Sequence, residues 1–218
     1  MGLGKTVEIL ACIVVNMPHF RMNKRSKTGL TTTLIVVPKS AVMQWQSEAQ
    51  HHCPDLKVSV YTKECEETPV EALSNDIILV TYDQLLRAAG PKSKKQSFLF
   101  KSEFFRVCLD EAHKIKNRAS ETFKVCCKLQ AKHRWCASGT PTPNGIAELY
   151  SYLKFIRHPL VEEFPAFRDK YLGGKQGLFS PDGAEKEYEE LDRLLEHVMI
   201  MLWRTTPLTL VSERICHL

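Results

Sequence analysis

Short runs of apolar and β-branched residues alternate along this chain with segments of helical periodicity. The run Thr33–Val37 (TLIVV) has no polar residue after its threonine, as is typical of a strand buried on both faces of a parallel sheet. Four further strand candidates lie within LKVSVY, DIILVTY, FFRVCLD and HRWCAS, and helical patterns separate most of them. Strands separated by helices predict an α/β fold, with a mainly parallel sheet flanked by helices.

A helix is predicted directly after Thr6. Four apolar residues recur at the spacing of one helical face: Leu10, Ile13, Val14 and Met17. We expect this helix to end before Pro18, because the residue that precedes a proline disfavours helical backbone.

The pattern changes near residue 145 and is helical from there onward. We expect residues 1–145 to form the sheet domain and residues 146–218 to form a helical extension. The extension contains a glycine-rich loop at Gly173–Ala184. An amphipathic helix is expected after it, at Leu191, Leu194, Leu195 and Val198.

The charge and the cysteine content restrict the class of protein. The 218 residues include 30 Lys and Arg against 25 Asp and Glu, and a formal charge of +5 suits a nucleic-acid partner without requiring one. The eight cysteines form no C-x-x-C pair, which favours reduced thiols in an intracellular protein. His51, His52 and Cys53 match no zinc-ligand spacing, so we favour surface histidines beside a core cysteine. No stretch is long and apolar enough to predict a membrane span.

Two adjacent carboxylates follow a hydrophobic strand in VCLDEAH. Asp110 and Glu111 should therefore lie at the carboxyl edge of the sheet, where α/β folds bind ligands. Gly4-Lys5-Thr6 matches the end of a phosphate-binding loop that enters a helix. Together these features predict a site for ATP and Mg²⁺.

Each residue of this predicted site has an expected role. Lys5 would reach the β- and γ-phosphates, Thr6 and Asp110 would hold Mg²⁺, and Glu111 would orient or deprotonate the attacking water. The phosphates would rest on the loop residues Gly2, Leu3, Gly4, Lys5 and Thr6.

The opening residues MGLGKT allow two interpretations. As a true start, Met1-Gly2 with Thr6 fits the pattern for fatty acylation of Gly2. As an interior segment they are the end of a phosphate loop, whose strand would lie before residue 1. We favour the second interpretation and expect the chain to be a fragment, because a loop that grips phosphate needs a preceding strand to anchor it.

Five ordered segments carry a resemblance to a known family: MGLGKT, LIVVPKSAVMQWQSE, DIILVTYDQL, VCLDEAHKIKN and RWCASGTPTPN. They closely resemble the first RecA-like motor lobe of the Swi/Snf family of DNA-dependent ATPases, in the second helicase superfamily. The segment that starts at DEAH is most similar to the fungal and repair-associated branch, whose members often carry a RING finger. ELYSYLKFIRHP and MIMLWRTT look, less specifically, like the helical protrusion of that family and its closing Leu-Arg-Arg-like segment.

The resemblance implies a P-loop fold, double-stranded DNA as a partner and a nuclear location. It also implies that nucleosomes or other DNA-bound proteins are the substrates. His113 would couple hydrolysis to motion, and Ser138, Gly139 and Thr140 would link nucleotide state to lobe closure. The phosphates of the tracked DNA strand would be met by Pro38, Lys39, Ser40, Thr81 and Tyr82.

Some features depart from the family or are missing. Pro143 stands where the family has glutamine, and Trp203 replaces the first arginine of a pair. The second motor lobe, which carries the arginine finger, is not in this sequence. We therefore expect negligible ATP hydrolysis by this chain alone, since a finger contributes about 10³- to 10⁵-fold in turnover.

Several alternatives stay open at this level. The chain could be a non-enzymatic DNA- or protein-binding module, or an unrelated phosphate-loop kinase that would leave SGTPTPN and VTYDQL unexplained. For Trp45 we favour core packing over stacking on DNA. The basic loops around Lys24 and Lys94 are interpreted as solvated insertions, with DNA contact as the alternative.

Overall fold

The computed structural model describes residues 4–17, 31–90, 96–140, 146–159, 161, 163–171 and 195. It divides into two compact units, Gly4–His158 and a second that joins residues 1–3 to residues 159–218. The described part of the second unit contains one helix, α9 (Phe164–Tyr171). The predicted domain boundary at residues 145 and 146 stays a prediction. Outside the described residues lie the glycine-rich loop, the lysines of both basic loops, Pro143, Trp203 and, apart from Leu195, the helix predicted after the loop.

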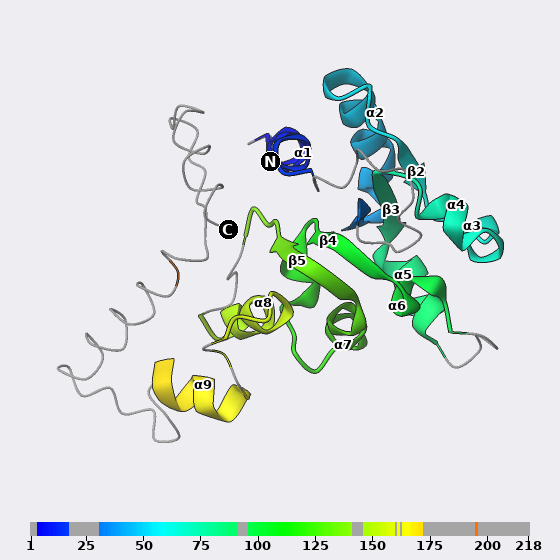
Figure 1. Cartoon of the computed structure of the whole chain (residues 1–218). Helices are drawn as coiled ribbons and strands as arrows, with labels where there is room; N and C mark the ends of the chain where they lie inside the picture. Colours follow the sequence, from blue (N-terminus) through cyan, green and yellow to red (C-terminus); the bar gives the residue numbers. More distant parts are fainter. Residues whose placement is uncertain are drawn as a thin grey trace. The chain divides into compact units, whose positions relative to one another are not determined.

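The first unit is built on a sheet of five parallel strands in the order β2-β3-β1-β4-β5 (Figure 1). Each predicted strand segment overlaps one of them, although β4 begins one residue and β5 three residues before the predicted segment. The predicted α/β fold with a parallel sheet is confirmed. The strands are β1 (Thr33–Val37), β2 (Val58–Val60), β3 (Ile77–Thr81), β4 (Glu103–Leu109) and β5 (Gln130–Cys136).

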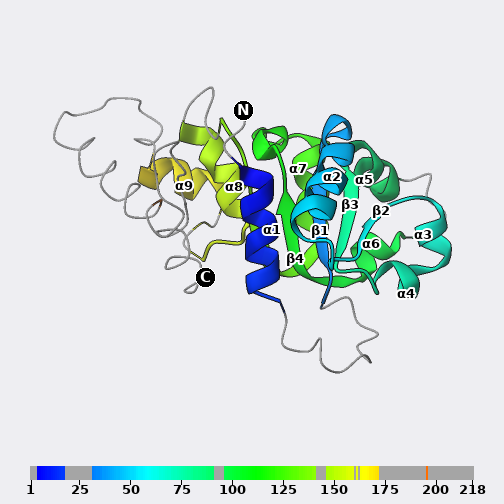
Figure 2. The ribbon, with the colours of Figure 1, turned by 90° about the horizontal axis from the view of Figure 1, so that it is seen from above.

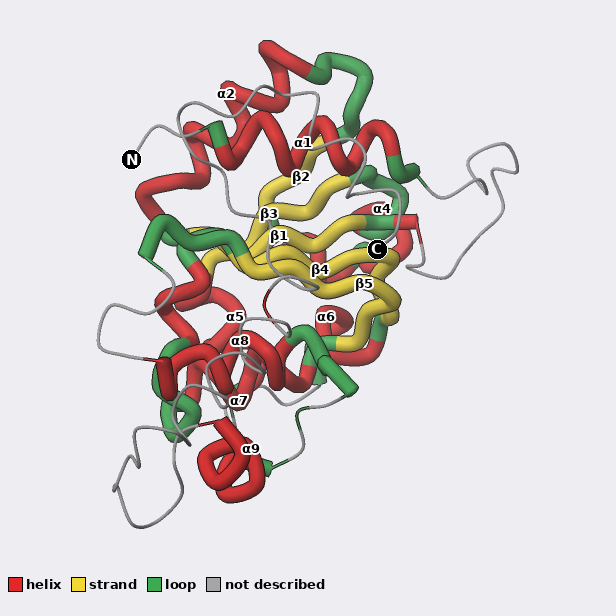
Figure 3. The backbone as a smooth tube through the Cα atoms, turned by 90° about the vertical axis from the view of Figure 1, so that its left-hand side faces the viewer, coloured by secondary structure: helices red, strands yellow, loops and turns green. Residues whose placement is uncertain are grey.

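Helices cover both faces of this sheet. Helices α1 (Lys5–Val15) and α2 (Val42–His52) lie next to each other on one face (Figure 2). Helices α5 (Tyr82–Ala89), α7 (Glu121–Lys128) and α8 (Leu149–Phe155) lie on the other face (Figure 3). Shorter elements connect them: α3 (Glu64–Glu67), α4 (Pro69–Ala72), α6 (Phe98–Lys101) and the 3-10 turns η3 (Lys39–Ala41), η4 (Ala112–Ile115) and η5 (Ile146–Glu148).

The core explains why the central strands lack polar alternation. All five residues of β1 are buried, because alternate side chains enter the cores on opposite faces of the sheet. Ile35 and Val37 pack with Ile77 and Leu79 in the core under α1 and α2. None of the described helices is long and apolar enough to cross a membrane.

The first helix differs from the prediction in one residue. α1 ends at Val15, before Pro18, and buries Leu10 and Ile13 as expected. Val14 is 44% exposed, so its assignment to the inner face was wrong. The buried stripe is completed by Ile9 and Met17, which lie four residues before and four residues after Ile13. Val14 follows Ile13 directly and is therefore rotated from it by about 100° around the helix axis.

Candidate nucleotide-binding site

The turn after β4 is held between its two neighbouring strands. The backbone N–H of Asp110 donates to the carbonyl of Val36 at 2.9 Å, and that of Ala112 donates to the carbonyl of Ala137 at 2.8 Å. Asp110 and Glu111 therefore lie at the carboxyl edge of the sheet, as the sequence predicted.

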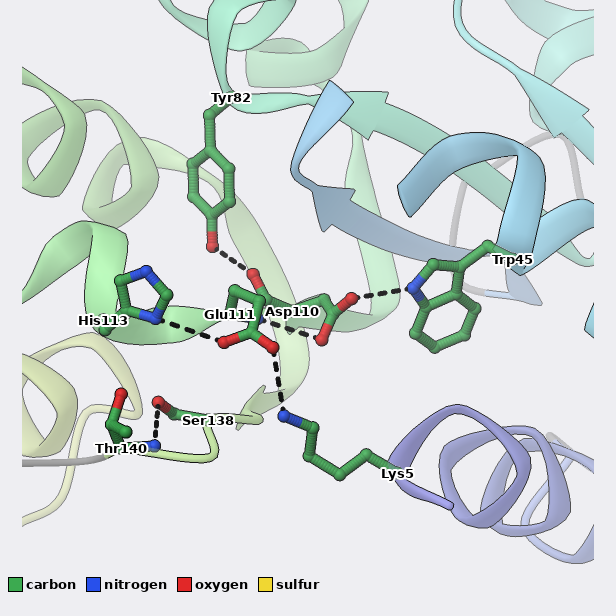
Figure 4. A network of polar contacts seen from close by, with 8 residues as sticks. All are labelled: Lys5, Trp45, Tyr82, Asp110, Glu111, His113, Ser138 and Thr140. Atoms are coloured by element: carbon green, nitrogen blue, oxygen red, sulfur yellow. Dashed lines mark hydrogen bonds and ion pairs between the residues drawn. The ribbon is translucent and has the colours of Figure 1, made fainter. Parts of the chain in front are cut away.

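Asp110 is the buried carboxylate of the site, with 7% of its surface exposed. Its Oδ2 accepts a hydrogen bond from the indole Nε1 of Trp45 at 2.8 Å, and its Oδ1 accepts one from the backbone N–H of Glu111 at 2.9 Å (Figure 4). Both donors are neutral. Within the described residues, no Lys, Arg or His forms an ion pair with this carboxylate.

Glu111 is the partly exposed carboxylate. Its backbone is left-handed, with φ 47° and ψ 53°, a conformation that residues other than glycine seldom adopt. Its Oε1 lies 3.1 Å from Lys5 Nζ, and its Oε2 lies 3.1 Å from Nδ1 of His113 (Figure 4). The contact with His113 has the distance of an ion pair but not the geometry of a hydrogen bond. Glu111 is thus held by two basic side chains from α1 and η4.

The start of α1 provides the backbone donors of the site. Gly4 takes a left-handed backbone with φ 77°, which directs the chain into the helix, and no side chain caps the first turn. Among the described residues, the first intrahelical bond runs from Glu8 N to Gly4 O, and the N–H groups before Glu8 have no acceptor there, as at a helix start that can bind an anion. Lys5 and Thr6 are both half-buried in this turn. Gly2 and Leu3 lie outside the described residues.

The segment after β5 approaches the same lysine. A Cβ placed on Gly139 would lie 3.5 Å from Lys5 Nζ, so the backbone there is close to the ammonium group. The backbone N–H of Thr140 donates to Ser138 Oγ at 3.2 Å. The fold therefore brings together three motifs that are distant in the sequence: the start of α1, the turn after β4 and the exit of β5.

The residues predicted to meet DNA fall into two groups. Pro38, Lys39 and Ser40 follow β1, and the last two are exposed. Thr81 and Tyr82 are buried and make intramolecular contacts. The Thr81 hydroxyl caps α5, and the Tyr82 hydroxyl donates to the backbone carbonyl of Asp110 at 2.8 Å. Burial raises the pKa of Tyr82 well above its usual range. DNA contact stays a prediction for all five residues.

The sequence did not reveal the polar role of Trp45. Its assignment to the core is confirmed, since it is 1% exposed. Its bond to Asp110 spans 65 positions, and no spacing rule connects a helix that follows one strand to a carboxylate that follows another. The only available signal was that both segments leave the sheet at its carboxyl edge.

The donor set fits ATP and Mg²⁺. An uncapped helix start with a lysine suits phosphate, and a buried carboxylate without a cationic partner suits a divalent cation. No group of three or more metal-ligating side chains occurs in the described part of the chain, but Mg²⁺ commonly uses one or two carboxylates, water and substrate phosphates. His51 and His52 are exposed beside Cys53, which packs on the core, in agreement with the interpretation favoured over zinc.

Comparison with known proteins places the chain in a family. The model of the SNF2-related domain matches residues 1–215. The chain belongs to this family. Among the relatives of this SNF2-related lobe, DNA repair protein rad5 of Aspergillus fumigatus is 36% identical and DNA repair protein rad8 of Schizosaccharomyces pombe is 34% identical, each over 72% of this chain and 15% of the relative. ATP-dependent helicase rhp16 of S. pombe is 34% identical over 72% of this chain and 18% of its own length.

A solved structure agrees with this assignment. The Sulfolobus solfataricus SWI2/SNF2 ATPase core in complex with double-stranded DNA superposes with a TM-score of 0.71 at 27% identity, over 92% of this chain and 38% of that chain. The predicted resemblance to a Swi/Snf motor lobe is therefore confirmed, together with the relationship to DNA-repair helicases. The SNF2-related lobe spans less than a fifth of the length of these curated relatives.

Proposed function

We propose that this chain is the ATP-binding lobe of a DNA-dependent ATPase that moves along double-stranded DNA, in DNA repair or chromatin remodelling in the nucleus. The observation that carries the proposal is the contact of Lys5 with Glu111, 106 positions apart, at 3.1 Å. It unites a phosphate-binding lysine and a hydrolytic carboxylate at the carboxyl edge of the sheet. Relatives named as DNA repair proteins and a structural neighbour solved with DNA support it.

The phosphate end of the mechanism uses α1. The N–H groups of its first turn and Lys5 Nζ bind the β- and γ-phosphate oxygens, together with the loop residues Gly2, Leu3 and Gly4. Lys5 exchanges its partner Glu111 for phosphate in this step. The exchange is inexpensive, because the ion pair is partly exposed and such pairs contribute about 0–1 kcal/mol.

The hydrolytic end uses the turn after β4. Asp110 and the Thr6 hydroxyl would hold Mg²⁺, which would supply positive charge to neutralise the phosphates. Glu111, released from Lys5, orients the attacking water and accepts its proton. His113 contacts Glu111 at 3.1 Å, and Ser138, Gly139 and Thr140 lie at the exit of β5 beside Lys5; these residues link the state of the site to motion of the lobe.

The DNA contact lies at the same edge of the sheet, after β1 and β3. Exposed Lys39 and Ser40, with Pro38, meet phosphates of the tracked strand, and the chain at Thr81 and Tyr82 contributes through its backbone, since both side chains are already engaged. Phosphate contacts carry no sequence information, as a motor on nucleosomes or other DNA-bound proteins requires.

Two binding measurements on the 218-residue chain test the proposal. A fluorescent ATP analogue should bind in the presence of Mg²⁺. Double-stranded DNA should bind with an affinity that falls as salt rises, and Lys39→Ala should reduce the slope of log K against log salt by about 1. Lys57→Ala, at an exposed lysine beside β2, should leave the slope unchanged.

The outcomes separate the two candidate functions. Binding of DNA without any binding of Mg²⁺-ATP would favour the non-enzymatic module. Equal slopes for Lys39→Ala and Lys57→Ala would remove Lys39 from the DNA contact.

A further inference from the structure

The buried side of the site depends on a side chain outside the predicted nucleotide motifs. Trp45 lies in α2, immediately after the turn that carries Lys39 and Ser40, and its indole N–H donates to Oδ2 of Asp110 at 2.8 Å. We propose that Trp45 is a positioning residue for the Mg²⁺ site: it fixes the Asp110 carboxylate in the orientation that receives the cation. This inference rests on the proposed function.

The chemistry of indole suits this role. A tryptophan offers a single N–H donor and no acceptor, and it is uncharged. It can therefore orient a carboxylate without neutralising it, whereas an arginine or lysine would compete with the cation. An ionised carboxylate has about four acceptor positions, and within the described part of the chain Asp110 uses two of them, for Trp45 and for the Glu111 backbone. The remaining positions are available to a cation or to its bound water.

The indole is itself held rigidly. Trp45 is 1% exposed and belongs to the core cluster that contains Leu10 and Ile13 of α1 and Ala49 of α2. Its ring therefore packs with α1, which carries Lys5, and with α2, which directly follows the turn η3 that contains Lys39 and Ser40. A donor fixed by packing limits the freedom of the carboxylate that it contacts, which is how outer-shell groups orient metal ligands.

A second tryptophan provides a matched control. Trp135 in β5 packs against the same core cluster as Trp45. Its ring lies 4.1 Å beneath the Arg106 guanidinium, and in the described residues its indole N–H has no carboxylate partner. Phe in place of either tryptophan removes one indole N–H and reduces the ring, but only Trp45→Phe removes a bond to Asp110.

The first experiment measures how much Mg²⁺ strengthens binding of a fluorescent ATP analogue to the full chain. Trp45→Phe should reduce the Mg²⁺-dependent gain in affinity about 10-fold, within the range found when outer-shell partners of metal ligands are removed. Affinity without Mg²⁺ should not change, and Trp135→Phe should keep the wild-type gain. In the Asp110→Asn background, Trp45→Phe should cause no further loss of that gain.

The second experiment observes the hydrogen bond itself. In a ¹H–¹⁵N spectrum, Trp45→Phe identifies the Trp45 indole resonance by its disappearance. Asp110→Asn should shift this resonance more than that of Trp135. Mn²⁺ with the ATP analogue should broaden the Trp45 resonance first, because the paramagnetic ion binds at Asp110.

The outcomes distinguish this inference from the function on which it rests. If wild type binds the analogue with Mg²⁺ but Trp45→Phe and Trp135→Phe behave alike, the positioning role is overturned and the proposed function is retained. A Trp45 indole resonance whose chemical shift does not change in Asp110→Asn would also overturn the positioning role of Trp45. If wild type binds neither the analogue nor Mn²⁺, both proposals fail together.

Discussion

Asp110 and Glu111 are adjacent in the sequence, yet they differ in burial and in the kind of partner that each carboxylate has. Asp110 is 7% exposed and receives two hydrogen bonds from neutral donors, Trp45 and the Glu111 backbone. The side chain of Glu111 is 26% exposed and contacts two basic side chains. Neutral donors orient a carboxylate without pairing its charge, whereas the partly exposed ion pairs of Glu111 can be exchanged for other partners. Metal binding and water activation need these two behaviours.

The backbone creates the difference. Tyr82 donates to the carbonyl of Asp110, and the Asp110 N–H donates to Val36, so this residue is held through both of its backbone groups. Glu111 then turns into the left-handed region, at φ 47°. Both residues lie in the turn after β4, and the change of backbone conformation between them directs their side chains apart. One carboxylate thus points into the core and its neighbour toward the start of α1 (Figure 4).

The largest effect is expected on the rigid side of the site. Trp45→Ala should lower the free energy of unfolding by about 3–5 kcal/mol, because it leaves a cavity in the core and removes a donor from a buried carboxylate. Met43→Ala, two residues away on the same helix but 81% exposed, should change it by less than about 0.5 kcal/mol. Urea unfolding measures both. Similar free energies of unfolding for the two variants would contradict a structural role of Trp45 in holding Asp110.

The exchangeable side should show the reverse pattern. Lys5→Ala should weaken binding of Mg²⁺-ATP about 10- to 100-fold, corresponding to roughly 1.5–3 kcal/mol for hydrogen bonds to charged groups. It should cost less than about 1 kcal/mol in stability, because its ion pair with Glu111 is partly exposed. Lys124→Ala, which breaks the exposed pair with Glu121, should leave nucleotide affinity unchanged. Titration with Mg²⁺-ATP measures the affinities, and urea unfolding measures the stabilities. A large loss of stability in Lys5→Ala would show that its ion pair with Glu111 is structural.

A smaller effect should come from the hydroxyl that anchors Asp110. Tyr82→Phe should cost about 1 kcal/mol in stability, since it removes a buried hydrogen bond of 2.8 Å. Tyr152 is a matched comparison, because its hydroxyl is buried without a hydrogen-bond partner in the described structure. Tyr152→Phe should be neutral or slightly stabilising. Thermal unfolding of the pair would refute the anchoring role if the two changes had the same effect.

The smallest effect concerns the backbone of Glu111. Glu111→Gly should raise the free energy of unfolding by up to about 1 kcal/mol. The left-handed conformation costs residues other than glycine about 1–2 kcal/mol, and part of this gain is offset because glycine loses more backbone entropy on folding. Arg157→Gly, at φ 58°, should give a similar gain. Destabilisation by Glu111→Gly alone would mean that its contacts with Lys5 and His113 outweigh the strain.

Much of the fold was predictable from local patterns. The run TLIVV is β1, and FFRVCLD contains most of β4 and the carboxylate that follows it. Strands buried on both faces are mainly apolar, and Arg106 is the exception in β4. The candidate phosphate and carboxylate motifs were also predictable, since a lysine at a helix start and acids after a strand have few other uses in combination. Val14 was misplaced, because a helix with apolar residues on more than one side does not define its buried stripe by spacing alone.

The sequence by itself determined the parallel α/β architecture, the strand segments and the residue types of the site, since all of these follow from hydrophobic periodicity and local chemistry. Only the tertiary structure decided that Trp45 would donate to Asp110, that Tyr82 would hold its carbonyl, and that Lys5 would pair with Glu111. These contacts join segments 28 to 106 positions apart. Each depends on the order of strands in the sheet and on the packing of helices across it, which no local pattern encodes.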